Sequence, residues 1–242
     1  MHNDVDKRRI GLIIPSVNIR MEPELSRCPQ LQSFNFYATR VMLNDTTKET
    51  LKAMEHDLNR AAKMIATVFP EAVVYGCTSG SFINGTKGNA NIIDTIQGEC
   101  NCPVVTASQA MVDSVKYIGA KSITLVTPYT DDINEREKNF FECNDIKVKS
   151  IRGLNIIPAE TLRMQPVEAI EDLVLTADRG SGTDAVFISC TNVEGFHICD
   201  GLERRLGKPV ITSNIACLWS LLRAIPNDVK INDHGTLLRE FM

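Results

Sequence analysis

The feature that most constrains this chain is a buried strand that ends in a cysteine, a pattern that occurs twice. Four apolar residues, Ala72–Tyr75, predict a buried strand, and the Gly/Cys/Thr/Ser run after them predicts a turn where a helix can begin. The segment Ala185–Asn192 repeats the pattern. Ligands of open α/β sheets bind at the carboxyl ends of the strands. Cys77 and Cys190 are therefore expected at a ligand site.

The order of strands, turns and helices also repeats along the chain. Pro103–Met111 reads PVVTASQAM and Pro209–Cys217 reads PVITSNIAC, and both follow one of the two cysteine-bearing strands. A helical period runs between strands, most clearly from Thr46 to Val68. We predict an α/β fold with two pseudo-symmetric Rossmann-like lobes, each a mostly parallel sheet flanked by helices, and an active site in the cleft between them. The matched segments are 10–18, 72–81 and 103–111 in one half and 122–130, 185–192 and 209–217 in the other.

The repeat also predicts where the lobes begin and end. We assign residues 1–118 to an N-terminal lobe and residues 119–213 to a C-terminal lobe. The final helix, within about 214–242, is expected to pack back on the N-terminal lobe. The tail from Pro226 onward is polar and is expected to be peripheral.

Local signals in the second half predict one helix and one strand in detail. Asp131 or Asp132 is expected to cap a helix over Ile133–Cys143. A strand is expected over Val148–Ile157, with a bend at Gly153.

Composition restricts the class of ligand. The net charge is −4 and no block of like charges occurs, so we expect neither nucleic acid nor a membrane as partner. No apolar stretch is long enough to span a bilayer, and the start of the chain does not resemble a signal peptide. These features predict a cytoplasmic enzyme that acts on a small molecule.

Most of the eight cysteines are expected to be buried, reduced thiols. This applies to Cys28, Cys143, Cys199 and Cys217, whereas the single-residue spacing of Cys100 and Cys102 lacks the partners of a zinc site. The chain has no phosphate-binding loop and no dinucleotide fingerprint. Its histidines are dispersed, so we expect no cofactor and no metal. They are His2, His56, His197 and His234.

Two facing thiols suit two kinds of chemistry. One thiolate can remove a proton next to a carboxylate while the opposite thiol returns one, or one thiolate can add to an activated double bond while the other handles the proton. Both reactions create negative charge beside a carboxylate, which Thr78, Ser79, Thr191 and their amides are placed to stabilise. At least one of the two thiols should have a pKa well below the roughly 8.5 of free cysteine.

Several motifs, in order, resemble the aspartate/glutamate racemase superfamily, and within it most closely the maleate cis–trans isomerase and arylmalonate decarboxylase branch. The resemblance runs from about Gly11 to Trp219. The segments that carry it are Pro15–Asn18, Met21–Glu24, Gly76–Ser79, Thr127–Tyr129, Ser189–Asn192 and Lys208–Asn214.

The resemblance implies a role for each residue of the site. Cys77 matches the nucleophilic cysteine of the isomerases and Cys190 their second catalytic cysteine. The decarboxylase has only the second of these. Asn18 and Tyr129 match residues that hold a substrate carboxylate, and Thr78 and Ser79 match the oxyanion-binding pair of the decarboxylase. Beside this resemblance, we expect Thr191 and Asn192 to help position the carboxylates. No cofactor is implied, and we expect a homodimer or a higher homo-oligomer.

Two departures from the isomerase pattern bear on the substrate. Ile157–Glu160 stands where the isomerases carry an Asp-Asn pair, and Asn155 is nearby but displaced. Glu194 follows Cys190 where a basic residue is common, and an acidic side chain facing the pocket would discourage a dicarboxylate.

These observations together predict a cofactor-independent isomerase that acts on a small carboxylate or dicarboxylate with two cysteines, as in conversion of maleate to fumarate. An aspartate/glutamate-type racemase and an arylmalonate decarboxylase-like enzyme are the alternatives. A catalytically silent carboxylate-binding protein is the alternative outside enzymes.

Overall fold

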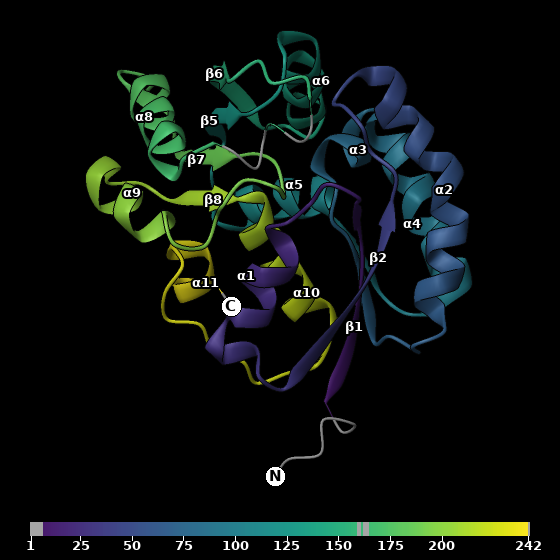
Figure 1. Cartoon of the computed structure of the whole chain (residues 1–242). Coiled ribbons are helices and arrows are strands. Elements are labelled where there is room, and N and C mark those ends of the chain that lie inside the picture. The colour runs from purple at the N-terminus through teal and green to yellow at the C-terminus, as the bar shows by residue number, and fades with distance from the viewer. Residues whose placement is uncertain (1–6, 159–160, 162–164, 242) are drawn as a thin grey trace.

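The protein is built on two four-stranded parallel sheets of the same strand order (Figure 1). The computed structural model describes residues 7–158, 161 and 165–241. The first sheet has the order β2-β1-β3-β4 and the second the order β6-β5-β7-β8. This identity of order confirms the two-lobed α/β fold. The strands are β1 (Arg8–Pro15), β2 (Phe34–Val41), β3 (Ala72–Tyr75), β4 (Val104–Thr106), β5 (Ser122–Thr127), β6 (Lys147–Gly153), β7 (Ala185–Ile188) and β8 (Val210–Thr212).

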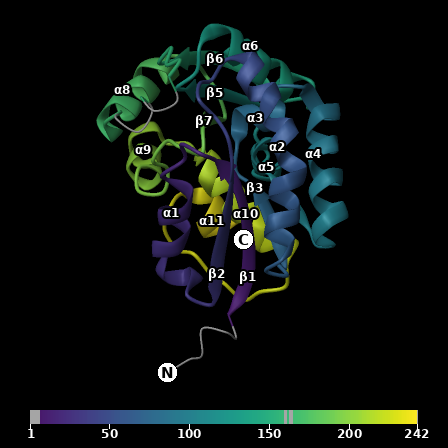
Figure 2. The same cartoon turned by 45° about the vertical axis from the view of Figure 1, so that its right-hand side comes forward.

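Helices cover both sheets. Helices α2 and α4 run side by side along the first sheet, α8 packs on β5, β6 and β7, and α6 packs on β6 (Figures 1 and 2). The helices and the one short 3-10 turn are α1 (Met21–Arg27), η2 (Pro29–Leu31), α2 (Lys48–Ala66), α3 (Thr78–Phe82), α4 (Gly85–Cys100), α5 (Ala107–Tyr117), α6 (Asp131–Glu142), α8 (Val167–Asp178), α9 (Cys199–Leu206), α10 (Ser213–Ala224) and α11 (Thr236–Glu240).

The cysteine-bearing strands are the inner strands of their sheets. β3 lies between β1 and β4, and β7 between β5 and β8, and every residue of both is buried. A parallel strand covered on both faces is apolar throughout, which is why AVVY and AVFI form these positions. Each fully buried Val, Ile or Phe contributes about 1.5–3 kcal/mol, so the two cysteines follow the most firmly held part of each lobe.

The last strand of each half passes into a helix in the same way. The hydroxyl of Thr106 accepts a hydrogen bond from the Gln109 N–H at 3.3 Å at the start of α5. The hydroxyl of Thr212 accepts one from the Ile215 N–H at 3.3 Å at the start of α10. The repeated threonine is therefore a helix N-cap in both halves.

Helix α10 follows the second sheet along the chain but packs mainly on the first half. It contacts α5, β3 and β4, as well as β8 (Figure 2). Its buried face includes Ile215, Leu218 and Leu222. The exact lobe boundaries at 118/119 and 213/214 stay predictions.

The chain after Pro226 is not peripheral, and this expectation was wrong. α11 buries Leu237 and Leu238, and the indole N–H of Trp219 donates to the Phe241 carbonyl at 2.9 Å. Two adjacent leucines within a polar tail are enough to fix it against α10 and β8.

Two local predictions in the second lobe also need correction. Thr130, rather than Asp131 or Asp132, is the N-cap of α6, and both aspartates lie in the first helical turn. β6 ends at Gly153, earlier than expected, because its partner strand β5 ends at Thr127, the residue paired with Gly153. A Cβ at Gly153 would lie 2.4 Å from the Tyr129 carbonyl oxygen.

Within the part of the chain that the structure describes, no helix is both long and apolar enough to cross a membrane.

Candidate active site

Cys77 is the N-cap of α3, directly after β3. Its sulfur accepts a hydrogen bond from the Gly80 N–H at 3.3 Å, and the Ser79 hydroxyl also interacts with it. Gly76 before it lets α1 approach, because a Cβ there would lie 2.3 Å from the Met21 sulfur. The cysteine is 3% exposed. It thus lies at a strand end, held by helix N-terminal donors, as the sequence predicts.

Cys190 follows β7 with an unusual backbone. Its φ of 95° lies in a region that non-glycine residues rarely adopt. Its N–H donates to the Ser213 hydroxyl at 3.0 Å, and its sulfur accepts from the Asn192 N–H at 3.4 Å. These bonds hold the strained residue in place. Such strain is commonly found at functional sites.

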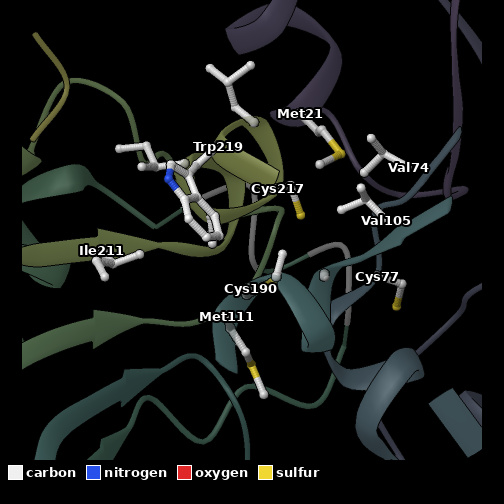
Figure 3. Close-up of a cluster of buried hydrophobic side chains, with 14 of the residues drawn as sticks. Met21, Val74, Cys77, Val105, Met111, Cys190, Ile211, Cys217 and Trp219 are labelled. Carbon is white, nitrogen blue, oxygen red and sulfur yellow. The ribbon is translucent and has the colours of Figure 1, made fainter. Parts of the chain in front are cut away.

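The two cysteines line one cavity between the lobes, and negative charge on Cys190 acts directly on Cys77. Figure 3 shows both among buried apolar side chains, including Met21 and Met111. The structure brings all eight site residues predicted from sequence to this cavity; their roles stay predictions. They are Asn18, Cys77, Thr78, Ser79, Tyr129, Cys190, Thr191 and Asn192.

Ser213, which the sequence analysis did not assign, connects the two cysteine-bearing segments. Its hydroxyl accepts from the Thr78 hydroxyl at 3.0 Å as well as from the Cys190 N–H. It is fully buried at the start of α10. Its position directly after the capping Thr212 was the available signal, since the first residue after a strand end can reach the site.

Three of the predicted substrate-binding residues join the lobes to each other. The Asn18 amide donates to the Thr191 hydroxyl at 3.0 Å, and its oxygen accepts two N–H groups at the start of α1. The Thr191 hydroxyl donates to the Gly76 carbonyl at 2.8 Å. Asn192 accepts from the Ile19 N–H at 2.9 Å. Asn18 retains one amide hydrogen that this seam does not use.

Tyr129 forms part of the cavity wall. It is 1% exposed, and its ring packs edge-on against Phe82 of α3 with centroids 6.2 Å apart. Its hydroxyl interacts with the Cys190 sulfur. The tyrosine thus places a hydroxyl donor beside the second thiol.

The cavity is nearly closed in this structure. It has an empty volume of about 310 Å³, part of it open to solvent, and its two cysteines are only 3% and 8% exposed. Leu43 and Thr46, from the segment after β2, line it and were not predicted. Thr46 donates from its hydroxyl to the Ile156 carbonyl at 3.0 Å and from its N–H to the Ile157 carbonyl at 3.1 Å. These bonds hold the Thr46 segment of the first lobe against the chain that follows β6 in the second.

Similarity to known proteins identifies the family of this chain. The family model for arylmalonate decarboxylase matches residues 10–238. The chain belongs to the arylmalonate decarboxylase family.

Maleate isomerases are among its relatives. The one from Nocardia farcinica is 28% identical over 243 residues, which cover 96% of each chain. The crystal structure of the Pseudomonas putida S16 maleate isomerase with maleate superposes with a TM-score of 0.89 at 25% identity, covering 96% of this chain and 97% of that one. A Nocardia farcinica cysteine-to-serine variant with a covalently bound succinylcysteine intermediate gives a TM-score of 0.87 at 26% identity, covering 96% and 98%.

Burial dominates the acidity of both thiols in this member of the family. Loss of water raises the pKa of Cys77 to about 12 and that of Cys190 to about 11. The Gly80 N–H lowers the first and the Asn192 N–H the second, but neither offsets desolvation. The expectation of a low thiol pKa was therefore wrong for the closed site. The N-terminal turn of α3 supplies donors, but the cavity excludes the water on which a thiolate depends.

Glu194 does not line the cavity, so its carboxylate does not face a dicarboxylate bound there. Its carboxylate pairs with Arg20 at 2.9 Å, beside a neighbouring pocket that shares only Asn192 with the site. The acidic charge is thus compensated and directed away from the thiols. Of the other departure, residues 159 and 160 lie outside the described residues, and Asn155 is exposed and does not line the cavity.

The described lining contains no histidine and no cationic side chain. The donors available to an anion are hydroxyls, an amide and backbone N–H groups. The proton-transfer groups at the cavity are the two thiols and the Tyr129 hydroxyl. Cofactor-free chemistry at a carbon next to a carboxylate is within the reach of this set.

Proposed function

We propose that this protein is a cofactor-independent cis–trans isomerase that converts maleate to fumarate. The observation that carries the proposal is the placement of two thiols, Cys77 and Cys190, on one closed interlobe cavity. The relatives named maleate isomerase match nearly the whole chain, which supports the same substrate class here. We propose in addition that the protein works in the cytoplasm as a homo-oligomer, for which sedimentation velocity is the direct test of assembly.

The reaction uses the thiols in turn. The Cys77 thiolate adds to one alkene carbon, and the electron pair of the double bond moves toward the carboxylate on the other carbon. The Cys190 thiol gives that carbon a proton, which leaves a succinyl thioether on Cys77. Rotation about the new carbon–carbon single bond follows. The Cys190 thiolate then removes the proton, the carbon–sulfur bond breaks, and fumarate and the Cys77 thiolate are released together.

Opening of the cavity supplies the thiolate. Desolvation is the largest cause of the raised pKa of Cys77, so entry of water through the Thr46 segment lowers that pKa toward its ordinary value. The N–H groups at the start of α3 then favour the anion. Closure over the substrate traps the thiolate next to the alkene.

Neutral donors hold the two carboxylates in this proposal. The Tyr129 hydroxyl and the free amide hydrogen of Asn18 bind one, and Thr78 and Ser79 stabilise the charge that develops on the other. Thr191 and Asn192 contribute by keeping Asn18 and the first lobe in register with Cys190. Because these donors carry no positive charge, they can hold a dianion only if no other negative charge lies close to it.

The test is incubation with maleate in deuterated water, followed by proton NMR. Fumarate should form with the wild-type protein, and Cys77→Ser and Cys190→Ser should each abolish turnover while the fold is retained by circular dichroism. Cys143→Ser is the matched control and should leave the rate unchanged. Cys143 is exposed, so the expectation that it is buried was wrong, whereas Cys28, Cys199 and Cys217 are buried as expected.

Other products would assign another function. α-Deuteration of D- or L-aspartate or glutamate with loss of optical activity, and no fumarate, would identify a racemase. Loss of carbon dioxide from phenylmalonate would identify a decarboxylase. Binding of maleate without any turnover, unaffected by either cysteine substitution, would identify a silent carboxylate-binding protein.

A further inference from the structure

A buried carboxyl group that the reaction does not use lies behind the site. Glu137 of α6 has no exposed surface. Neither of its oxygens makes a hydrogen bond of normal geometry with a described residue. The Ser189 hydroxyl lies beside it and lowers its pKa slightly, but it too lacks a hydrogen bond of normal geometry. A carboxyl group left this way is costly to the fold, which points to a use.

The charge of Glu137 is felt by two residues of the cavity. A negative charge there raises the pKa of Tyr129 and that of Cys190. Glu137 itself does not line the cavity. Three residues earlier on the same helix, the Asn134 amide donates to the Tyr129 carbonyl at 3.3 Å, and Ser189, which lies beside Glu137, directly precedes Cys190. These contacts place Glu137 behind the wall that carries Tyr129 and Cys190.

Among the described residues, no positive charge compensates this carboxyl group from the elements that pack most closely on α6, which are α3, α4 and β6. Helix α3 carries no titratable side chain. The ionisable residues of β6 and the charged residues of α4 are all exposed, whereas Glu137 is fully enclosed. They are Lys147, Lys149, Arg152, Lys87, Asp94 and Glu99. On α6 itself, the half-buried Arg136 and Lys138 pair with Asp132 and Glu135. The cavity groups whose pKa values respond to a charge on Glu137 are Tyr129 and Cys190.

Desolvation consequently keeps the group neutral over much of the physiological range. It raises the pKa of Glu137 to about 8, so the carboxyl group is protonated at neutral pH and ionises above it. Its ionisation would place a negative charge behind Tyr129 and Cys190 in a medium that screens charge poorly.

We propose that Glu137 is a positioning residue that must be protonated for a dicarboxylate to bind, and that its ionisation prevents this binding at alkaline pH. The inference rests on the proposed function. A bound dianion and a Cys77 thiolate already bring three negative charges into a cavity whose described lining has no cation. A fourth charge behind Tyr129 opposes binding directly, and it also makes Cys190 a weaker proton donor.

The first experiment measures maleate binding by isothermal titration calorimetry in the Cys77→Ser background, which cannot turn substrate over. Affinity should fall by up to about tenfold per pH unit above pH 8, since only the protonated form binds. With Glu137→Gln added, affinity should change by less than about twofold over the same range. Glu142→Gln, an exposed carboxylate on the same helix, is the matched control and should keep the tenfold fall.

The second experiment needs no substrate. In the same Cys77→Ser proteins, the pH dependence of Cys190 alkylation by iodoacetamide is followed by mass spectrometry. Removing the Glu137 charge should move the labelling midpoint to lower pH, and Glu142→Gln should not. Glu137→Leu, which is apolar and of similar volume, replaces Glu137→Gln if the amide disturbs folding.

The outcomes separate the two proposals. Absence of maleate binding at every pH would count against the proposed substrate, while a shifted labelling midpoint would still support the role of Glu137. An unchanged midpoint together with an equally steep loss of affinity in Glu137→Gln would overturn that role.

Discussion

The Thr78 hydroxyl donates a hydrogen bond of 3.0 Å to the Ser213 hydroxyl, and this bond joins the segment after Cys77 to the helix that begins beside Cys190. Ser213 also accepts from the Cys190 N–H at 3.0 Å. One buried hydroxyl therefore sets the position of one cysteine directly and of the other through its neighbour. A fixed position of the two cysteines relative to each other matters because the two thiols must act on adjacent carbons.

Ser213→Ala should lower both stability and activity. The substitution leaves the Cys190 N–H and the Thr78 hydroxyl buried without their acceptor, at a cost of about 1–3 kcal/mol. Loss of alignment should lower kcat for fumarate formation roughly tenfold to a hundredfold. Urea denaturation and steady-state kinetics measure the two effects. Ser220→Ala, on the same helix but in a different pocket, should change neither, and equal kinetics for the two variants would show that Ser213 does not align the thiols.

The backbone conformation of Cys190 predicts that glycine there is at least as stabilising as alanine, the reverse of the usual order in a helix. At a φ of 95°, Cys190→Gly relieves strain that Cys190→Ala keeps, so the glycine variant should be as stable as the alanine variant or up to about 1 kcal/mol more stable. Cys143, at the C-cap of α6 with a φ of −62°, is the control, and there alanine should be the more stable. Urea denaturation of the four variants gives the comparison. Both Cys190 variants should be inactive.

Much of the fold could be predicted because its signals are local. The apolar runs of β3 and β7, and the PVVT and PVIT segments before α5 and α10, encode strand, turn and helix within a few residues. Their repetition indicates the pairing of the two lobes. The tail was mispredicted because Leu237 and Leu238 show their role only through the surface of α10 and β8 that they cover.

Which residues line the site could be predicted from the sequence, but their hydrogen bonds could not. Cys77 and Asn18 follow strand ends, so the sequence places them in the cleft. The hydrogen bonds of Asn18, however, depend on Thr191, 173 residues later in the chain. The prediction of a low thiol pKa failed for the same reason. Donors at a helix start are visible in the sequence, whereas the burial that raises both thiol pKa values is a property of the folded chain.

The Arg20–Glu194 ion pair should tune affinity for an anionic substrate. Arg20→Gln leaves the Glu194 charge uncompensated in the neighbouring pocket that shares Asn192 with the site, and it should raise KM for maleate about twofold to fivefold at low salt, while Glu194→Gln should not raise it. Stability should change by less than about 1 kcal/mol because both side chains are partly exposed. The double variant should return KM close to the wild-type value. A KM unaffected by Arg20→Gln at low salt would mean that Glu194 lies outside the field felt by the substrate.

Glu137 should also make folding stability depend on pH. Its pKa is raised from 4.5 to about 8 by desolvation, so the folded state binds this proton more tightly than the unfolded chain does. The resulting stabilisation is fully present below about pH 4.5, declines as the unfolded chain ionises, and is lost once the pH passes about 8. Relative to Glu137→Leu, the wild-type protein should therefore lose on the order of a few kcal/mol of unfolding free energy between pH 5 and pH 8. Urea denaturation at several pH values measures the difference, with Glu142→Gln as the control that should follow the wild-type curve. Parallel curves for the wild-type protein and Glu137→Leu would mean that Glu137 is protonated to the same extent in the folded and unfolded states. The raised pKa of Glu137 in the folded protein would then be wrong.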